Sequence, residues 1–253
     1  MIAEIAHKGR TFKVDLGAPI DLAFPLHNGA DQLRAWWIDP VTMEPVRNGD
    51  TIYAVKDGAP VNFRTIRFNP HGHGTHTESV GHITPEVHPV GELLKRFFFT
   101  AQLVSLLPEQ RRAPDGRTDQ VITLEQLRNV VNERPSEALV IRTLPQDANA
   151  AHKDWSGSNP GYLQSTACAW LRSIGVKHLL LDLPSVDREE DGGVLAAHHA
   201  FWDHPNTLDL ERTITELIHV PGGVKDGEYL LELQLPRFVN DAAPSRPVLY
   251  AML

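Results

Sequence analysis

Residues able to bind a metal ion are concentrated between positions 69 and 82. The stretch reads Asn69-Pro-His-Gly-His-Gly-Thr-His-Thr-Glu-Ser-Val-Gly-His82. Neutral imidazole and carboxylate are the usual ligands of Zn²⁺ and of neighbouring divalent transition metals. A histidine-rich surface loop rarely contains a carboxylate inside the cluster, so the stretch predicts a metal site. Its candidate ligands are His71, His73, His76, Glu78 and His82.

Two glycines interrupt these histidines. Glycine accepts positive φ angles and the close approach of other groups, which allows a short loop to fold around an ion. In extended backbone, residues two apart point to the same side. This spacing pairs His71 with His73 before Gly74. The same spacing pairs His76 with Glu78 after it.

A second group of polar residues follows a short apolar run. Asp182-Leu-Pro-Ser-Val-Asp187 lies at the carboxyl end of this predicted strand, where open α/β sheets bind ligands. Residues 195–202 then read as a helix with two adjacent histidines, His198 and His199. Neighbouring helix positions point about 100° apart, so only one of the two histidines can face a given site.

The order of the predicted elements is typical of an α/β protein with a mixed sheet. Residues 137–143 and 176–183 are apolar runs that read as buried strands. Residues 162–174 between them have helical spacing, with Gly175 as the expected C-cap. A strand, a helix and a strand at this spacing form a βαβ unit, so part of the sheet is expected to be parallel.

Other segments position the metal-binding stretch or complete the sheet. Residues 61–68 alternate in polarity and predict a strand that ends at this stretch. The pattern from Thr123 to Gln126 has the form of a capping box for a helix over 124–132 that stops before Pro135. The remaining predicted elements are a hairpin or two short strands at 2–6 and 11–15, a buried strand at 97–106, and closing strands at 228–235 and 245–253.

Composition narrows the class of protein. The 253 residues have 42% hydrophobic and 22% charged content, and we expect one domain over 1–253 because no linker interrupts them. The 24 Lys and Arg are scattered and the net charge is −8, which argues against nucleic acid and membrane partners. No apolar run approaches the ~20 residues that span a bilayer, and the first residues do not resemble a signal peptide. The single cysteine, Cys168, excludes an intrachain disulfide and fits the cytoplasm.

The metal-binding stretch resembles the motif H-x-G-T-H-x-D-x-P-x-H of the cyclase family of metal-dependent hydrolases, which includes bacterial kynurenine formamidases. Weaker landmarks follow the family order from Asp15 to Leu253. The motif's matching positions are Gly74, Thr75, His76 and His82, whereas Gly72 replaces the first His, Glu78 the Asp and Val80 the Pro.

The resemblance implies a swivelling β/β/α fold and a first metal ion bound by His76 and Glu78. His71 or His73 would replace the missing first ligand. His71 is favoured because the glycine behind it can re-aim it, but both stay open. His82 is the implied acid/base residue.

The resemblance also implies a second ion, held by His198 and Glu216 with Glu78 as a bridge. His199 is the alternative to His198. The expected cofactor is Zn²⁺ first and Mn²⁺ second, with one or two ions per chain. Family members form oligomers with sites near subunit contacts, so a homodimer or homotetramer is expected.

The implied activity is hydrolysis of a small aryl formamide such as N-formylkynurenine, by hydroxide generated at the metal. One alternative is opening of a cyclic amide or lactone, as in isatin hydrolase. Another is a metal- or ligand-binding relative without catalytic activity, suggested by Gly72. Trp36 and Trp37 form either core packing or an aromatic wall of the substrate pocket.

Overall fold

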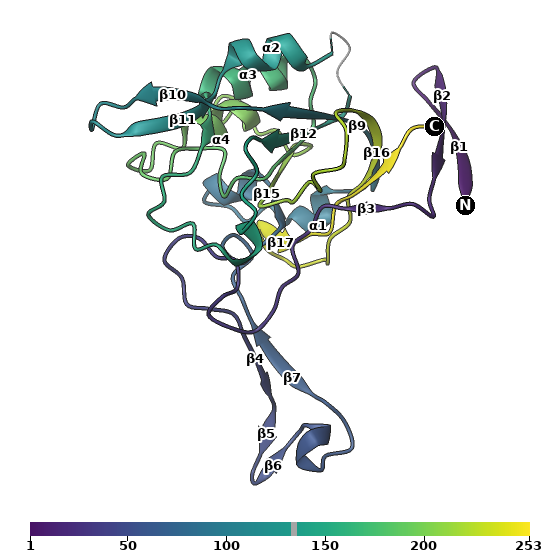
Figure 1. Ribbon diagram of the computed structural model, residues 1–253, viewed down its shortest axis with the longest axis vertical. Helices are drawn as coiled ribbons and strands as arrows, with labels where there is room; N and C mark the ends of the chain where they lie inside the picture. The colour runs from purple at the N-terminus through teal and green to yellow at the C-terminus, as the bar shows by residue number, and fades with distance from the viewer. Residues whose placement is uncertain (133–135) are drawn as a thin grey trace.

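A nine-stranded mixed sheet forms the centre of the molecule (Figure 1). The computed structural model describes residues 1–132 and 136–253. Four neighbouring strands are parallel, in the spatial order β15 (Thr213–Glu216), β14 (His178–Leu181), β12 (Ala138–Thr143) and β9 (Phe98–Leu106). The predicted α/β class with a mixed sheet is confirmed.

Antiparallel strands extend the sheet on both sides. β8 (His76–Glu78) pairs with β15, and β17 (Ala242–Pro244) pairs with β8. The histidine-rich stretch of residues 69–82 therefore enters the sheet itself, beside the last parallel strand. On the other side lie β16 (Gly227–Glu232), β18 (Val248–Ala251) and β3 (Ile20–Asp21).

Three helices cover one face of the sheet: α2 (Leu124–Val130), α3 (Ser165–Ser173) and α4 (Ala196–Trp202). Alternate strand residues such as Leu139, Leu179 and Ile214 are fully buried beneath them, because side chains two apart in a strand share a face. α3 connects the parallel strands β12 and β14, so the predicted βαβ unit is confirmed.

The two predicted helices differ from expectation at their ends. Tyr162 and Leu163 form β13, which pairs with β11 (Thr118–Ile122), itself paired with β10 (Glu109–Arg112). This pairing delays the start of α3 to Ser165. The capping box of Thr123 and Gln126 is present at α2, which ends at Val130. Pro135, the expected stop signal, lies outside the described residues.

The opposite face packs against loops and the short helix α1 (Val90–Leu93). Its core contains Leu22, Phe99, Leu180 and Leu231. None of the helices in the described ranges 1–132 and 136–253 is long and apolar enough to cross a membrane.

Two hairpins project from this body (Figure 1). The first is the predicted N-terminal hairpin, β1 (Ile2–His7) and β2 (Arg10–Asp15). The second is a long arm containing β4 (Thr42–Pro45), β5 (Arg47–Asn48), β6 (Thr51–Ile52) and β7 (Arg64–Arg67). The strand predicted at 61–68 is shortened to β7, which leads back to the histidine-rich stretch of residues 69–82. Phe63, just before β7, and Ile66 within it are exposed.

Candidate metal centre

Separate parts of the chain bring imidazoles and carboxylates together beside β8. His76 and Glu78 are two apart in this strand and point to the same face. The antiparallel register places Glu216 of β15 opposite His76. α4 covers this face and contributes His198. All four side chains belong to residues that are at most 4% exposed.

The loop before β8 supplies His71 to this cluster and directs His73 elsewhere. His71 Nδ1 lies 3.1 Å from Glu78 Oε2. His73 Nδ1 accepts the Asn69 N–H at 2.8 Å, and its Nε2 donates to the Asp39 carbonyl at 2.8 Å. Both ring nitrogens of His73 are therefore occupied outside the cluster.

The two glycines of the loop explain this arrangement. A Cβ on Gly72 would lie 2.3 Å from Ile38 Cδ1 and 3.1 Å from the Ala35 carbonyl oxygen. No side chain fits there without movement of its neighbours, so position 72 adds none to the cluster and the neighbouring His71 reaches it instead. Gly74 has φ +133°, a conformation that L side chains rarely adopt, and it turns the chain into β8.

Two inward-facing atoms of the cluster are buried without a hydrogen-bond partner among the described residues: Glu78 Oε2 and His76 Nε2. Glu78 Oε2 is close to His71, and His76 Nε2 is 3.4 Å from Glu216 Oε2, but neither contact has hydrogen-bond geometry. Glu78 Oε1 contacts His198 Nε2 at 3.2 Å. Orphaned buried polar atoms are costly, and a bound cation would satisfy these two.

Each inner histidine also contacts an acceptor outside the cluster. Such an acceptor takes the N–H of one ring nitrogen and leaves the other nitrogen directed inward, which is the usual arrangement around metal-bound histidines. The contacts are His71 Nε2 to Asp241 Oδ2 at 2.8 Å, His198 Nδ1 to Asp187 Oδ2 at 2.6 Å, and His76 Nδ1 to the Gly74 carbonyl at 3.0 Å.

Carboxylates on both sides of two rings raise the proton affinity of these rings. Burial lowers the pKa of His71, but Asp241 and Glu78 outweigh it and raise the pKa to about 10. Burial likewise opposes the charge on His198, and Asp187 and Glu78 raise its pKa to about 10. Without a metal ion, both imidazoles therefore carry a proton on each ring nitrogen at neutral pH and are positively charged. A divalent cation would take the place of these protons.

His82 lies at the open side of the cluster, on the short 3-10 turn Val80–Ile83. Its side chain is 32% exposed, and its Nδ1 is 3.5 Å from Asp241 Oδ2 and 3.8 Å from Glu78 Oε2. Burial opposes the charge on Glu78, but His82 and the other imidazoles hold the pKa of Glu78 well below its usual range. Burial also opposes the charge on Asp241, whose pKa the hydrogen bonds from His71 and His82 lower strongly.

Sequence reasoning did not predict Asp241 as a member of the site. Asp241 precedes β17, and the pairing of β17 with β8 carries it to the cluster. It is 170 positions from its partner His71 and belongs to no motif, so only the sheet pairing reveals it. Asp187 was noted as an acid at a strand end, but its contact with His198 was not foreseen.

The other predicted site residues lie outside the cluster. His199 is directed at His204, whose carbonyl it contacts through Nδ1 at 3.0 Å. Trp36 is partly buried against a small apolar group that includes Trp155. Trp37 is 66% exposed and lines a surface pocket of about 400 Å³ next to the loop of His73. A substrate-binding role for the two tryptophans stays a prediction.

The donor set fits a divalent transition metal. Nitrogen and carboxylate oxygen atoms of His71, His76 and Glu78 lie within 4.8 Å of one another, as do those of Glu78, His82 and His198. The orphaned atoms and the outer acceptors agree with this fit. The roles of His71, His76, Glu78, His198 and Glu216 as ligands stay predictions that this geometry supports.

Comparisons with known proteins identify the family. Residues 14–188 match the family described as "Putative cyclase", so the chain belongs to this family, as predicted. A kynurenine formamidase from Bordetella avium (strain 197N) is 29% identical over 227 residues, which cover 85% of this chain and 97% of the relative.

Solved structures agree on the fold. A predicted metal-dependent hydrolase from Bacillus stearothermophilus has a TM-score of 0.60 at 17% identity. The match covers 92% of this chain and 98% of the hydrolase chain. An isatin hydrolase bound to the product analogue thioisatinate has a TM-score of 0.65 at 11% identity. The match covers 93% of this chain and 92% of the isatin hydrolase chain. At these identities the likeness concerns the fold alone.

The first prediction concerns which histidines bind metal. His76→Ala and Glu78→Ala should each lower Zn²⁺ affinity by more than ~100-fold, because even outer contacts of metal ligands are worth ~10–100-fold. His71→Ala should have a comparable effect. The matched variant His73→Ala should keep the affinity within about tenfold, since its ring faces away. Titration with a competing chelator measures this. Equal losses in the His71 and His73 variants would contradict the assignment.

The second prediction concerns pH. Metal binding at neutral pH should release protons, because His71 and His198 hold them in the metal-free protein with pKa values raised to about 10. Apparent affinity should therefore rise with pH from ~6 up to ~9. Calorimetric titration in buffers of different ionisation enthalpy counts the released protons. Binding without proton release would show that these rings are neutral or do not contact the ion.

Proposed function

We propose that this chain is a metal-dependent hydrolase that cleaves the C–N bond of a small aryl formamide. The observation that carries the proposal is the buried Glu78 carboxylate between His71 and His198, next to the orphaned His76 nitrogen. The relatives named kynurenine formamidase support this chemistry and the class of substrate. The prediction of a metal-dependent amide hydrolase from the sequence agrees with them.

The residues divide into holding groups and a proton-transfer group. His71, His76 and Glu78 would hold one ion. A second ion would use His198 and Glu216, because the two oxygens of Glu78 face different imidazoles. A divalent metal bound there lowers the pKa of water and polarises the scissile carbonyl. We propose Zn²⁺ first and Mn²⁺ second, since imidazole and carboxylate suit both and affinity favours zinc.

His82 is placed to move protons at the open side of this centre. Its ring lies 4.3 Å from that of His71 and 5.4 Å from that of His198, measured between centroids. Asp241, at 3.5 Å from Nδ1, can hold a proton on that nitrogen. An imidazole in this position can deliver a proton to the leaving amine. Partial exposure lets the ring exchange that proton with solvent.

The same scaffold admits two other outcomes, which a substrate panel distinguishes. We expect Zn²⁺- or Mn²⁺-loaded protein to release formate from formanilide and N-formylkynurenine, and to act on isatin more slowly. Faster opening of isatin would favour the cyclic amide alternative. Metal binding without turnover of any formamide, cyclic amide or lactone would favour a non-catalytic relative.

The third prediction concerns the role of His82. His82→Ala should retain the metal and lose ~10²–10⁴ in kcat, the usual contribution of general acid–base catalysis. His152→Ala is the control for turnover, because this histidine is exposed and contacts Asp31 rather than the cluster. Metal content, melting temperature and turnover are measured on the same samples. Full turnover of His82→Ala with intact metal would remove His82 from the mechanism. A lower melting temperature with normal turnover would make its role structural.

The expected homodimer or homotetramer and the cytoplasmic location stay proposals. Support for an oligomer comes from the projecting arm of β4 to β7, whose exposed apolar side chains would be covered by another subunit. These side chains are Val55, Val61, Phe63 and Ile66. A small molecule stays the proposed substrate, and the scattered basic residues give no support for nucleic acid or membrane partners.

A further inference from the structure

A cavity of about 380 Å³ lies at the carboxyl edge of the parallel strands. Residues that follow each of the four strands line it: Leu107 after β9, Leu144 after β12, Asp182 after β14 and Ile218 after β15. Open α/β sheets bind small ligands at this edge, and the volume is within the usual range for ligand pockets. The lining contains none of the candidate metal ligands.

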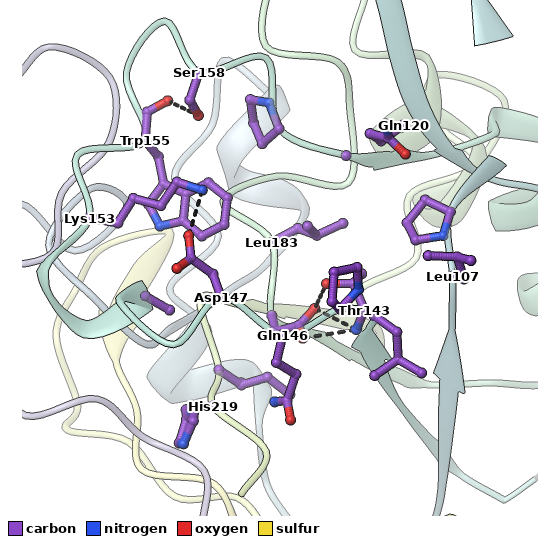
Figure 2. A pocket seen from close by; sticks show the side chains of 18 of the residues that line it. Leu107, Gln120, Thr143, Gln146, Asp147, Lys153, Trp155, Ser158, Leu183 and His219 are labelled. Atoms are coloured by element: carbon purple, nitrogen blue, oxygen red, sulfur yellow. Dashed lines mark hydrogen bonds and ion pairs between the residues drawn. The ribbon is translucent and has the colours of Figure 1, made fainter. Parts of the chain in front are cut away.

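The walls of this cavity are largely apolar, with flat rings on one side. Figure 2 shows Trp155, Lys153 and Asp147 on one side, with Thr143 and Leu107 on the other. Phe24, His219 and three prolines (Pro108, Pro145 and Pro160) complete much of the lining. Such walls favour a ligand with a flat apolar body.

Asp182 is the charged group of this cavity that lacks a cationic partner. Its two oxygens accept the Thr143 N–H at 2.9 and 3.1 Å, and Oδ1 also accepts the Thr143 hydroxyl at 2.9 Å. Among the described residues it forms no ion pair. The nearby Arg142 is used elsewhere, by Asp226 and by the carbonyl of Val224.

The other ionisable groups of the cavity compensate one another. Lys153 pairs with Asp147 at 2.9 Å, and its ammonium also lies 3.9 Å from the centre of the Trp155 ring. Burial lowers the pKa of His219, which keeps this ring neutral. Burial raises the pKa of Asp182 to about 7 despite the hydrogen bonds from Thr143. An ionised Asp182 therefore gives the cavity a net negative charge, which a bound cation would offset.

We propose that this cavity is a second ligand site, which binds a small organic ammonium compound with a flat apolar body. The ammonium group donates to the Asp182 carboxylate, and the body packs among Phe24, Trp155 and Leu183. A carboxylate has about four acceptor positions, so the Thr143 hydrogen bonds leave capacity for this contact. A buried charge-assisted hydrogen bond gives the ammonium preference over neutral analogues.

The site is distinct from the metal centre although both lie along the same sheet edge. In β15 and the residues after it, Glu216 belongs to the metal centre and Ile218 to the cavity. In the segment after β14, Asp182 lines the cavity, whereas Asp187 contacts His198. Occupation of the cavity therefore does not require the metal.

Benzylammonium and benzyl alcohol, which share a shape and differ in charge, test the proposal by calorimetry at about pH 8, where Asp182 is mostly ionised. Wild-type protein should bind one benzylammonium per chain. It should bind benzyl alcohol at least about tenfold more weakly. Asp182→Asn should remove this preference. The control Asp50→Asn also removes one negative charge, but from the exposed arm, and should bind like wild type. Circular dichroism checks that both variants fold.

Each of these results would overturn the proposal: no saturable binding of benzylammonium, equal binding of the alcohol, unchanged preference in folded Asp182→Asn, or an equal loss in Asp50→Asn. The comparison of the two ligands on wild-type protein decides the matter even if Asp182→Asn fails to fold. The titration is repeated after removal of metal with a chelator. Binding that persists supports the cavity, and binding that disappears assigns the amine to the metal centre instead.

Discussion

The pairing of β8 with β15 is the constraint on which the candidate metal centre depends. It joins a strand whose three residues are all buried to the end of a parallel sheet, and sets Glu216 opposite His76. β17 then pairs with the free edge of β8 and brings Asp241 to His71. A shift of one residue in this register would turn the ligands to the opposite face. The geometry of the centre is therefore a consequence of sheet register rather than of the loop alone.

This arrangement places several ionisable groups in a buried position that an ordinary core would exclude. Buried charges are tolerated when they are paired and hydrogen-bonded. Here each inner histidine has an outer acceptor, and Glu78 faces two imidazoles. Paired groups account for most of the polar atoms, and the two orphaned atoms face the interior of the cluster. Within the cluster, the two atoms left without a hydrogen-bond partner are therefore ones that a cation can satisfy.

Much of this structure could be predicted from the sequence because local patterns determine it. The βαβ unit followed from apolar runs, and the start of α2 from Thr123 and Gln126. The pairing of His76 and Glu78 on one face followed from their spacing. Other features depend on contacts between distant segments. The exclusion of a side chain at Gly72 by Ile38, the occupied ring of His73 and the approach of Asp241 all require tertiary structure.

The carboxyl edge of the parallel strands links the two sites. Strand ends expose backbone and side-chain groups at one edge, and the connecting loops separate this edge into two sites. In one site carboxylates and imidazoles compensate one another around Glu78. In the other, Asp182 has no cationic partner among the described residues, and burial among mostly apolar walls raises its pKa to about 7. The difference follows from α4, whose His198 reaches Glu78 on one face of the sheet, whereas Asp182 lines a cavity whose lysine, Lys153, is already paired with Asp147.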